Sequence, residues 1–161
     1  MENKLNYFTH KEHRLAPELY TGIVRVSFTL CIKERRYIFT SPSIVDTCID
    51  ALRESLNTYD CKNWVYIFMP DHVHLVLEGR SEKANVLKAI TLFKQKTGYW
   101  FSHNAPAIKW QKSSYDHIHR KEDDLVKHVR YILDNPVRKG LCHEWKEYPY
   151  KGSLDWDIGT V

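Results

Sequence analysis

The spacing of apolar residues along the chain alternates between a strand period and a helix period. Residues 21–32 are rich in β-branched and aromatic side chains, which predicts a strand. Residues 61–69 and 72–78 are two more such runs, and only Pro70-Asp71 separates them, which predicts a β-hairpin. Residues 110–119 predict a weaker strand that is polar on both faces.

Between these strands the apolar residues recur at helical spacing. One helix is expected to begin at Ser41-Pro42 and to carry its apolar positions through Leu56. A second is expected from Ala84 to Thr97, with Gly98 as its C-terminal stop.

A third helix is expected near the C-terminus. Asp123 or Asp124 can cap its first turn, and Asn135-Pro136 can end it. Its predicted apolar stripe consists of Leu125, Val126, Val129, Ile132 and Leu133.

The predicted order of elements is β-α-β-β-α-β-α. This order indicates an α+β fold of the ferredoxin-like (split βαβ) type: an antiparallel sheet with helices on one face, the other face free, and an added C-terminal helix. A chain of 161 residues, 43% of them apolar, fits a single domain over 1–161. Residues 1–20 are predicted to form an N-terminal arm and residues 141–161 a C-terminal tail.

Composition narrows the range of functions. A net charge of +4 favours anionic partners mildly, and ten Tyr and five Trp suit a surface that stacks on unpaired bases. The four cysteines are scattered without a Cys-x-x-Cys pair, which favours reduced thiols. The chain shows neither an apolar leader nor a membrane span, so we expect a cytoplasmic, nucleoid-associated protein with no membrane partner.

The strongest chemical signal is the pair His72 and His74 in Met-Pro-Asp-His-Val-His-Leu-Val-Leu. Alternate residues of a strand share a face, so both imidazoles are expected on the free face, opposite the aliphatic set. Neutral imidazole is the commonest metal ligand. A bare His-x-His is nonetheless about as often plain polar surface. Glu78 shares this face and is better explained as a solvated charge than as a further ligand.

The third helix carries Tyr131 and Asn135 outside its apolar stripe, on a face shared with His128 and Asp124. Residues four apart are neighbours on a helix. Taken alone, Tyr131 fits a ring packed at the edge of the stripe. Phosphodiester transfer gives the set a joint role: the phenol attacks, a divalent cation polarises the phosphate, and Asn135 adds a third ligand.

Tyr115 is an alternative nucleophile. It lies in the weak strand within Ser-Tyr-Asp-His-Ile-His-Arg, where His117 and His119 share its face. No amide or acidic ligand at helical spacing accompanies it, so Tyr115 ranks second, and both histidines are expected to be surface groups.

Several segments together resemble the REP-associated tyrosine transposases and related single-tyrosine His-hydrophobic-His (HUH) transposases. The His72–His74 segment is similar to the family's His-hydrophobic-His motif. Residues 130–141, Arg-Tyr-Ile-Leu-Asp-Asn-Pro-Val-Arg-Lys-Gly-Leu, are similar to its Tyr-Ile-x-x-Asn-Pro-Val-x-x-Gly signature. Trp110-Gln-Lys and the Tyr115 segment also match. The resemblance covers roughly residues 14 to 150 and weakens after Gly140.

The resemblance implies a metal-dependent enzyme that nicks and rejoins single-stranded DNA beside the hairpin of a repeated extragenic palindrome. It implies Tyr131 as the nucleophile of a 5′-phosphotyrosine link, His72, His74 and Asn135 as metal ligands, and Mg²⁺ or Mn²⁺ as the ion. DNA phosphates are expected to contact basic residues near the tyrosine and on the second helix: Arg138, Lys139, Arg130, Lys88, Lys94 and Lys96.

Two alternatives remain open. One is a rolling-circle replication initiator or relaxase, which uses the same chemistry, although the chain has no room for a helicase domain. The other is a hairpin-binding protein whose catalysis has lapsed, although pure binding needs neither the histidines nor the tyrosine. The sequence leaves monomer and homodimer undecided.

Overall fold

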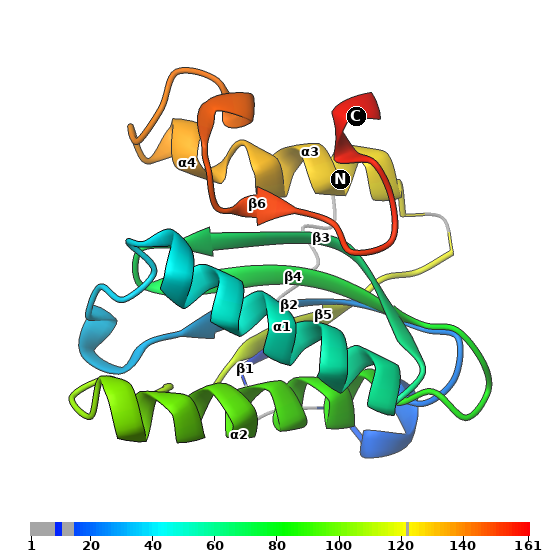
Figure 1. The fold of residues 1–161 in the computed structure, drawn as a ribbon. Helices are drawn as coiled ribbons and strands as arrows, with labels where there is room; N and C mark the ends of the chain where they lie inside the picture. The colour runs from blue at the N-terminus through cyan, green and yellow to red at the C-terminus, as the bar shows by residue number, and fades with distance from the viewer. Residues whose placement is uncertain (1–8, 11–14, 122) are drawn as a thin grey trace.

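The computed structural model describes residues 9–10, 15–121 and 123–161, and its strands form one antiparallel sheet (Figure 1). The strand order is β1-β5-β2-β4-β3-β6. The strands are β1 (Thr9–His10), β2 (Arg25–Cys31), β3 (Cys61–Met69), β4 (His72–Gly79), β5 (Tyr115–Ile118) and β6 (Lys151–Gly152). The helices are α1 (Pro42–Thr58), α2 (Val86–Asn104), α3 (Leu125–Leu133) and α4 (Asn135–Arg138), with 3-10 turns at Pro17–Tyr20, Lys33–Arg35, Trp145–Glu147 and Ile158–Thr160. The predicted α+β sheet architecture is confirmed.

Helices α1 and α2 cover one face of the sheet. The odd residues of β4, Val73, Leu75 and Leu77, are fully buried in the core cluster beneath these helices. The period-2 alternation of β4 therefore assigned its two faces correctly, because a strand that buries one face must direct every second side chain into it.

The opposite face is not free, and this prediction is wrong. A second core cluster joins Val65, Ile67 and Val76 of the sheet to Val129 and Leu133 of α3. Figure 1 shows α3, α4 and the C-terminal segment on the side of the sheet away from α1 and α2. The apolar stripe of α3 must itself be buried, and the aliphatic side chains on this face of β3 and β4 are the surface that it covers.

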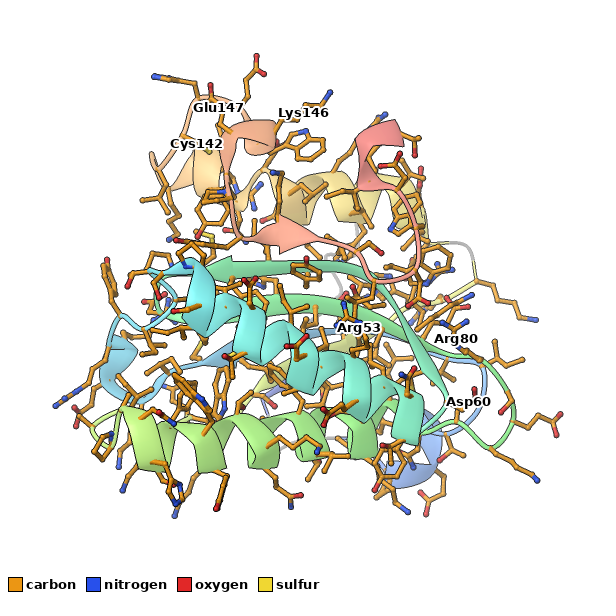
Figure 2. The ribbon with its side chains drawn as sticks, in the orientation of Figure 1. Arg53, Asp60, Arg80, Cys142, Lys146 and Glu147 are labelled. Carbon is orange, nitrogen blue, oxygen red and sulfur yellow. The ribbon has the colours of Figure 1, made fainter. Side chains whose placement is uncertain are left out.

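The predicted C-terminal tail belongs to this second layer. Its strand β6 pairs with β3, and Trp156 packs edge-on against Trp64. Figure 2 places Cys142, Lys146 and Glu147 of the tail beyond α3, far from the α1–α2 layer. The tail therefore adds apolar cover to the face that carries the candidate site.

The predicted arm is described only in part, since residues 1–8 and 11–14 lie outside the described residues. Its last residue, Tyr20, is fully buried in the core and donates a hydrogen bond to Asp116 (3.1 Å). The end of the segment predicted as an arm is thus part of the packed domain. Among the described residues, no helix is both long and apolar enough to cross a membrane.

Two helix predictions need correction. Helix α2 continues through Gly98 to Asn104, because Phe101 is buried in the core and Trp110 lies beside Gly98 and donates its indole N–H to Thr97 (2.8 Å). Packing of the extra turn outweighs the weak helix propensity of one glycine. In α3 the stripe is narrower than predicted: Val126 is 40% exposed.

Candidate functional site

The two histidines of β4 lie side by side on the face toward α3. Their Nε2 atoms are 3.1 Å apart, and their rings meet edge to face. His72 is buried and His74 is half-buried. The predicted sharing of one face is therefore correct, but the pair is sheltered and not open surface.

Each histidine has its other ring nitrogen occupied. Nδ1 of His72 is 2.6 Å from a carboxylate oxygen of Asp71, and Nδ1 of His74 is 2.9 Å from Oγ1 of Thr29. If both Nδ1 atoms carry the proton, both Nε2 lone pairs point into the space between the rings. Hydrogen bonds at the far nitrogen that fix the orientation of a histidine are typical of metal ligands.

The donor set fits one divalent cation. Two nitrogens about 2.1 Å from the same ion and about 90° apart would lie about 3 Å from each other, close to the observed spacing. Facing lone pairs repel each other unless a proton or a cation lies between them. The pair could therefore supply two preformed ligands to one ion and would leave its remaining coordination positions to other groups.

Burial opposes protonation at this site. It lowers the pKa of His74 to about 3, helped by the neighbouring His72 and by the positive charge of Arg138. Burial also lowers the pKa of His72, against the opposing effect of Asp71. Both imidazoles are thus neutral near pH 7, as metal coordination requires.

Asp71 and Arg35 form an anchor for His72 that the sequence did not reveal. The Arg35 guanidinium donates to Asp71 (Nε to Oδ2, 2.8 Å). Burial raises the pKa of Asp71, but the hydrogen bonds from His72 and Arg35 outweigh burial and hold the pKa below its ordinary value. Asp71 directly precedes His72 in the hairpin turn, whereas Arg35 ends the 3-10 turn Lys33–Arg35 after β2, where it has a left-handed backbone (φ 53).

Asp71→Asn is expected to weaken Mn²⁺ or Mg²⁺ binding by roughly 10- to 100-fold, the usual cost of removing such an outer partner. The amide keeps an oxygen that can accept from His72 but loses the charge that makes the imidazole a better ligand. Isothermal titration with Mn²⁺ measures the change. Asp124→Asn, an exposed position elsewhere, serves as the control, and equal affinities for the two variants would contradict the assigned role.

Tyr131 lies on α3, with its side chain 60% exposed. The Arg138 guanidinium lies over its ring, 4.0 Å from the centroid. The same guanidinium is close enough to His74 to depress its pKa, and Lys139 acts similarly on His72. The positive charges of Arg138 and Lys139 therefore act on the histidine pair, and Arg138 also contacts the tyrosine ring.

Asn135 begins the short helix α4 directly after α3, separated from it only by Asp134. The predicted continuous helix through residue 135 is thus interrupted by one residue, since Pro136 lacks an N–H group and favours a helix start. Asn135 is half-buried. Its role as a third ligand stays a prediction.

Tyr115 lies on the same face of the sheet as the histidine pair. It pairs with Thr29 of β2, which on its other side pairs with His74. Neighbouring strands are about 4.8 Å apart, which puts the backbones of Tyr115 and His74 about 10 Å apart. Tyr115 is 40% exposed and remains the alternative nucleophile.

The other residues predicted for the site lie away from the histidine pair or are bonded to other groups. Glu78 is not a solvated charge: burial raises its pKa, but hydrogen bonds from Trp64 and Arg25 outweigh burial and lower it. Lys94 donates to the Gln111 carbonyl (2.9 Å) and Lys96 pairs with Glu54 (2.9 Å). Both lysines are on α2, across the sheet from the histidines. Arg130 is exposed on α3.

A second group of histidines lies on the α3 face, and the prediction that they are surface groups is wrong for His119. Its side chain is only 2% exposed. Ser27 Oγ lies 2.6 Å from His119 Nε2 and 2.8 Å from His128 Nε2, which links β5 to α3. Strand parity placed His119 on this face, but only the tertiary structure showed that α3 covers it.

The metal-free protein is expected to lose stability as the pH falls from 7 to 4. Burial, helped by neighbouring histidines, lowers the pKa of His119 to about 3 and of His128 to about 4, as it does for His74. The unfolded chain takes up these protons near pH 6.5, so it binds more protons than the folded state below that pH. Stability is therefore full above about pH 6.5 and falls by at most about 1.4 kcal/mol per pH unit for each histidine. Urea unfolding at several pH values measures this, and a flat profile would contradict it.

Comparison with known proteins agrees with this geometry. The family model described as "Transposase IS200 like" matches residues 23–134. A Haemophilus influenzae protein described as a REP-associated tyrosine transposase is 24% identical over 134 residues, covering 76% of each chain.

Two solved structures share the fold. A REP-associated tyrosine transposase bound to a REP hairpin superposes with a TM-score of 0.73 at 19% identity, covering 87% of this chain and 81% of that one. A Deinococcus radiodurans protein assigned as a transposase gives a TM-score of 0.53 at 16% identity, covering 74% and 92%. Because the matched family model spans strands β2 to β5, the histidine pair and α3, the chain belongs to the IS200-like transposase family.

Proposed function

We propose that this protein nicks single-stranded DNA beside a hairpin and transfers the strand through a 5′-phosphotyrosine intermediate. The observation that carries the proposal is the pair of Nε2 atoms 3.1 Å apart, each imidazole anchored through Nδ1, below the helix that bears an exposed tyrosine. The relative bound to a REP hairpin supports a hairpin substrate.

In the proposed reaction, the Tyr131 oxygen attacks the scissile phosphorus. The new Tyr–O–P bond forms, with loss of the phenol proton to solvent, as the bond from phosphorus to the 3′ oxygen breaks. That oxygen takes up a proton from solvent to become a free 3′-hydroxyl. A 3′-hydroxyl later attacks the phosphotyrosine and restores the phenol, so the bond energy is conserved between nicking and joining.

The proposal gives the chain's own groups the following roles. His72, His74 and Asn135 would hold Mg²⁺ or Mn²⁺, which supplies Lewis-acid polarisation of the phosphate. Arg138 orients the Tyr131 ring and, with Lys139, offsets the phosphate charge. The shelter of α3 and the sheet reduces competition from water.

A covalent-adduct assay tests the proposal. Labelled single-stranded hairpin DNA is incubated with protein and Mg²⁺ or Mn²⁺, and denaturing gels detect a protein–DNA band that forms only with metal. A hairpin that shifts on a native gel yet gives no adduct with either metal would replace this proposal with the lapsed, binding-only protein. A preference for a plasmid or phage origin hairpin over a genomic repeat would favour the replication initiator.

A further inference from the structure

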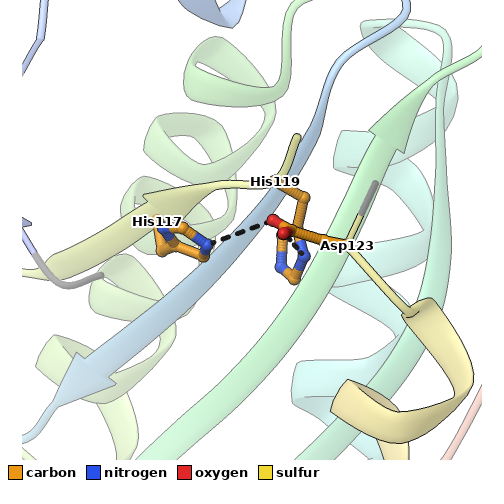
Figure 3. A group of neighbouring side chains, drawn as sticks. All are labelled: His117, His119 and Asp123. Atoms are coloured by element: carbon orange, nitrogen blue, oxygen red, sulfur yellow. Dashed lines mark ion pairs between the residues drawn. The ribbon is translucent and has the colours of Figure 1, made fainter. Parts of the chain in front are cut away.

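The α3 face of the sheet holds a second cluster of metal-ligating side chains that the proposed reaction does not use. His117 and His119 come from β5 and its end, and Asp123 comes from the loop before α3. One ligand atom from each lies within 4.8 Å of the other two. Figure 3 shows the two rings turned toward the same carboxylate.

The spacing within the cluster is too long for direct ion pairs of good geometry. Asp123 Oδ2 is 3.7 Å from His117 Nε2 and 4.0 Å from His119 Nδ1. Three ligands about 2.0–2.1 Å from a tetrahedral ion would be about 3.4 Å apart. The two distances to Asp123 exceed this spacing by about 0.3 and 0.6 Å, so side-chain shifts would be needed to close the group around one ion.

His119 provides independent evidence for a ligand. Its side chain is only 2% exposed. Even so, among the side-chain nitrogen and oxygen atoms buried in the described residues, its Nδ1 is the one without a hydrogen-bond partner. That atom is aimed at Asp123. A buried polar atom without a partner is energetically unfavourable, and a bound cation would satisfy its lone pair.

The other ring nitrogen of His119, Nε2, is hydrogen-bonded, as is usual in a histidine that binds a metal. Its Nε2–H can donate to Ser27 Oγ, whose hydroxyl can then donate to His128 Nε2. That tautomer leaves a lone pair on Nδ1, facing the Asp123 carboxylate. In metalloproteins, a hydrogen bond at the ring nitrogen that does not bind the metal commonly orients the ligating histidine.

We propose that His117 Nε2, His119 Nδ1 and Asp123 bind a Zn²⁺-type transition-metal ion, separate from the ion of the catalytic pair. Two imidazoles and one carboxylate suit zinc or cobalt, whereas Mg²⁺ prefers an all-oxygen shell. The ion ties β5 to the start of α3. It therefore fixes the first turn of the helix that carries Tyr131.

The test uses the full chain with His72→Ala and His74→Ala, which removes the first pair of ligands. This protein is loaded with Co²⁺ or Zn²⁺ alone, freed of excess metal, and examined for bound metal and for visible Co²⁺ absorption. We expect about one retained equivalent and the intense bands of a low-coordinate cobalt site. Absence of retained metal in this background would overturn the proposal.

Two loop variants supply a matched comparison in the same background. Asp123→Asn removes the ligand charge but keeps an oxygen that can accept from the Arg120 N–H. Asp124→Asn removes the same charge one position later and keeps a good helix cap, since Asn and Asp cap equally well. We expect at least a tenfold loss of Zn²⁺ affinity for Asp123→Asn and none for Asp124→Asn. Equal affinities would overturn the proposal.

A second readout guards against damage to the fold. Zn²⁺ should raise the melting temperature of the His72→Ala/His74→Ala protein and of its Asp124→Asn form, but not of its Asp123→Asn or His119→Asn forms. An equal rise in all four would show that the ion binds elsewhere. None of these measurements involves DNA, so failure here is distinct from failure of the proposed nicking reaction.

Discussion

Tyr131→Phe is expected to abolish the covalent protein–DNA adduct, with a loss of at least about 10³-fold in the rate of nicking. The variant removes one oxygen, the atom proposed to bond to phosphorus, and leaves the ring beneath Arg138 in place. The side chain is 60% exposed, so loss of the hydroxyl should cost little stability. Denaturing gels with labelled hairpin DNA measure the adduct, and native gels measure binding, which should persist.

Tyr115→Phe is the matched control for this experiment. Tyr115 is also partly exposed on the α3 face, and it lies across β2 from His74. We expect this variant to keep the adduct. If Tyr115→Phe loses the adduct and Tyr131→Phe keeps it, the nucleophile has been assigned to the wrong tyrosine.

His74→Ala is expected to reduce metal-dependent nicking by at least about 100-fold, more than loss of an outer partner causes. The substitution removes one of two Nε2 ligands and leaves His72 facing a cavity. Nicking rates measured over a range of Mn²⁺ concentrations separate weaker metal binding from slower chemistry. Excess Mn²⁺ should recover part of the rate if the remaining His72 and Asn135 still hold the ion.

His103→Ala is the control for general loss of an imidazole, because His103 is exposed at the end of α2. It should leave the rate unchanged. Full nicking activity of His74→Ala at every Mn²⁺ concentration would exclude the histidine pair as the metal site. A loss of hairpin binding together with activity would instead indicate a folding defect, which circular dichroism detects.

The two largest predicted effects are at residues of different elements, His74 of β4 and Tyr131 of α3. The structure shows how these two elements are brought together. Helix α3 packs on the face of the sheet that bears the histidines, through Val129, Ile132 and Leu133. Tyr131 belongs to the same helix but lies outside this stripe. The apolar packing therefore fixes the position of the helix relative to His72 and His74, and the other side of the helix carries Tyr131, the proposed nucleophile.

The sequence by itself determined that strands β2 to β5 exist, that β3 and β4 form a hairpin, and that His72 and His74 share a face; it did not predict β1 or β6, and the strand expected over 110–119 is only Tyr115–Ile118. These features depend on local periodicity, which is set by backbone geometry within one element. The same periodicity located Tyr131 off the apolar stripe of its helix. The resemblance to the transposases rests on these short segments, and the family match confirms it.

Only the tertiary structure decided what surrounds those residues. The register of β2 against β4 brings Thr29 to His74, and the loop after β2 brings Arg35 to Asp71. Such partners are far apart in the chain, so no local pattern encodes them.

The same limit explains the wrong predictions. The sheet face was expected to be free, Gly98 to end its helix and His119 to be exposed, but each depends on what a distant segment covers. Local periodicity places a side chain on a face of its own element. Burial of that face depends on which other apolar surface remains uncovered, and this is a property of the whole chain. The sequence thus identified the two histidines as a pair, and the folded structure made that pair a sheltered site below a tyrosine-bearing helix.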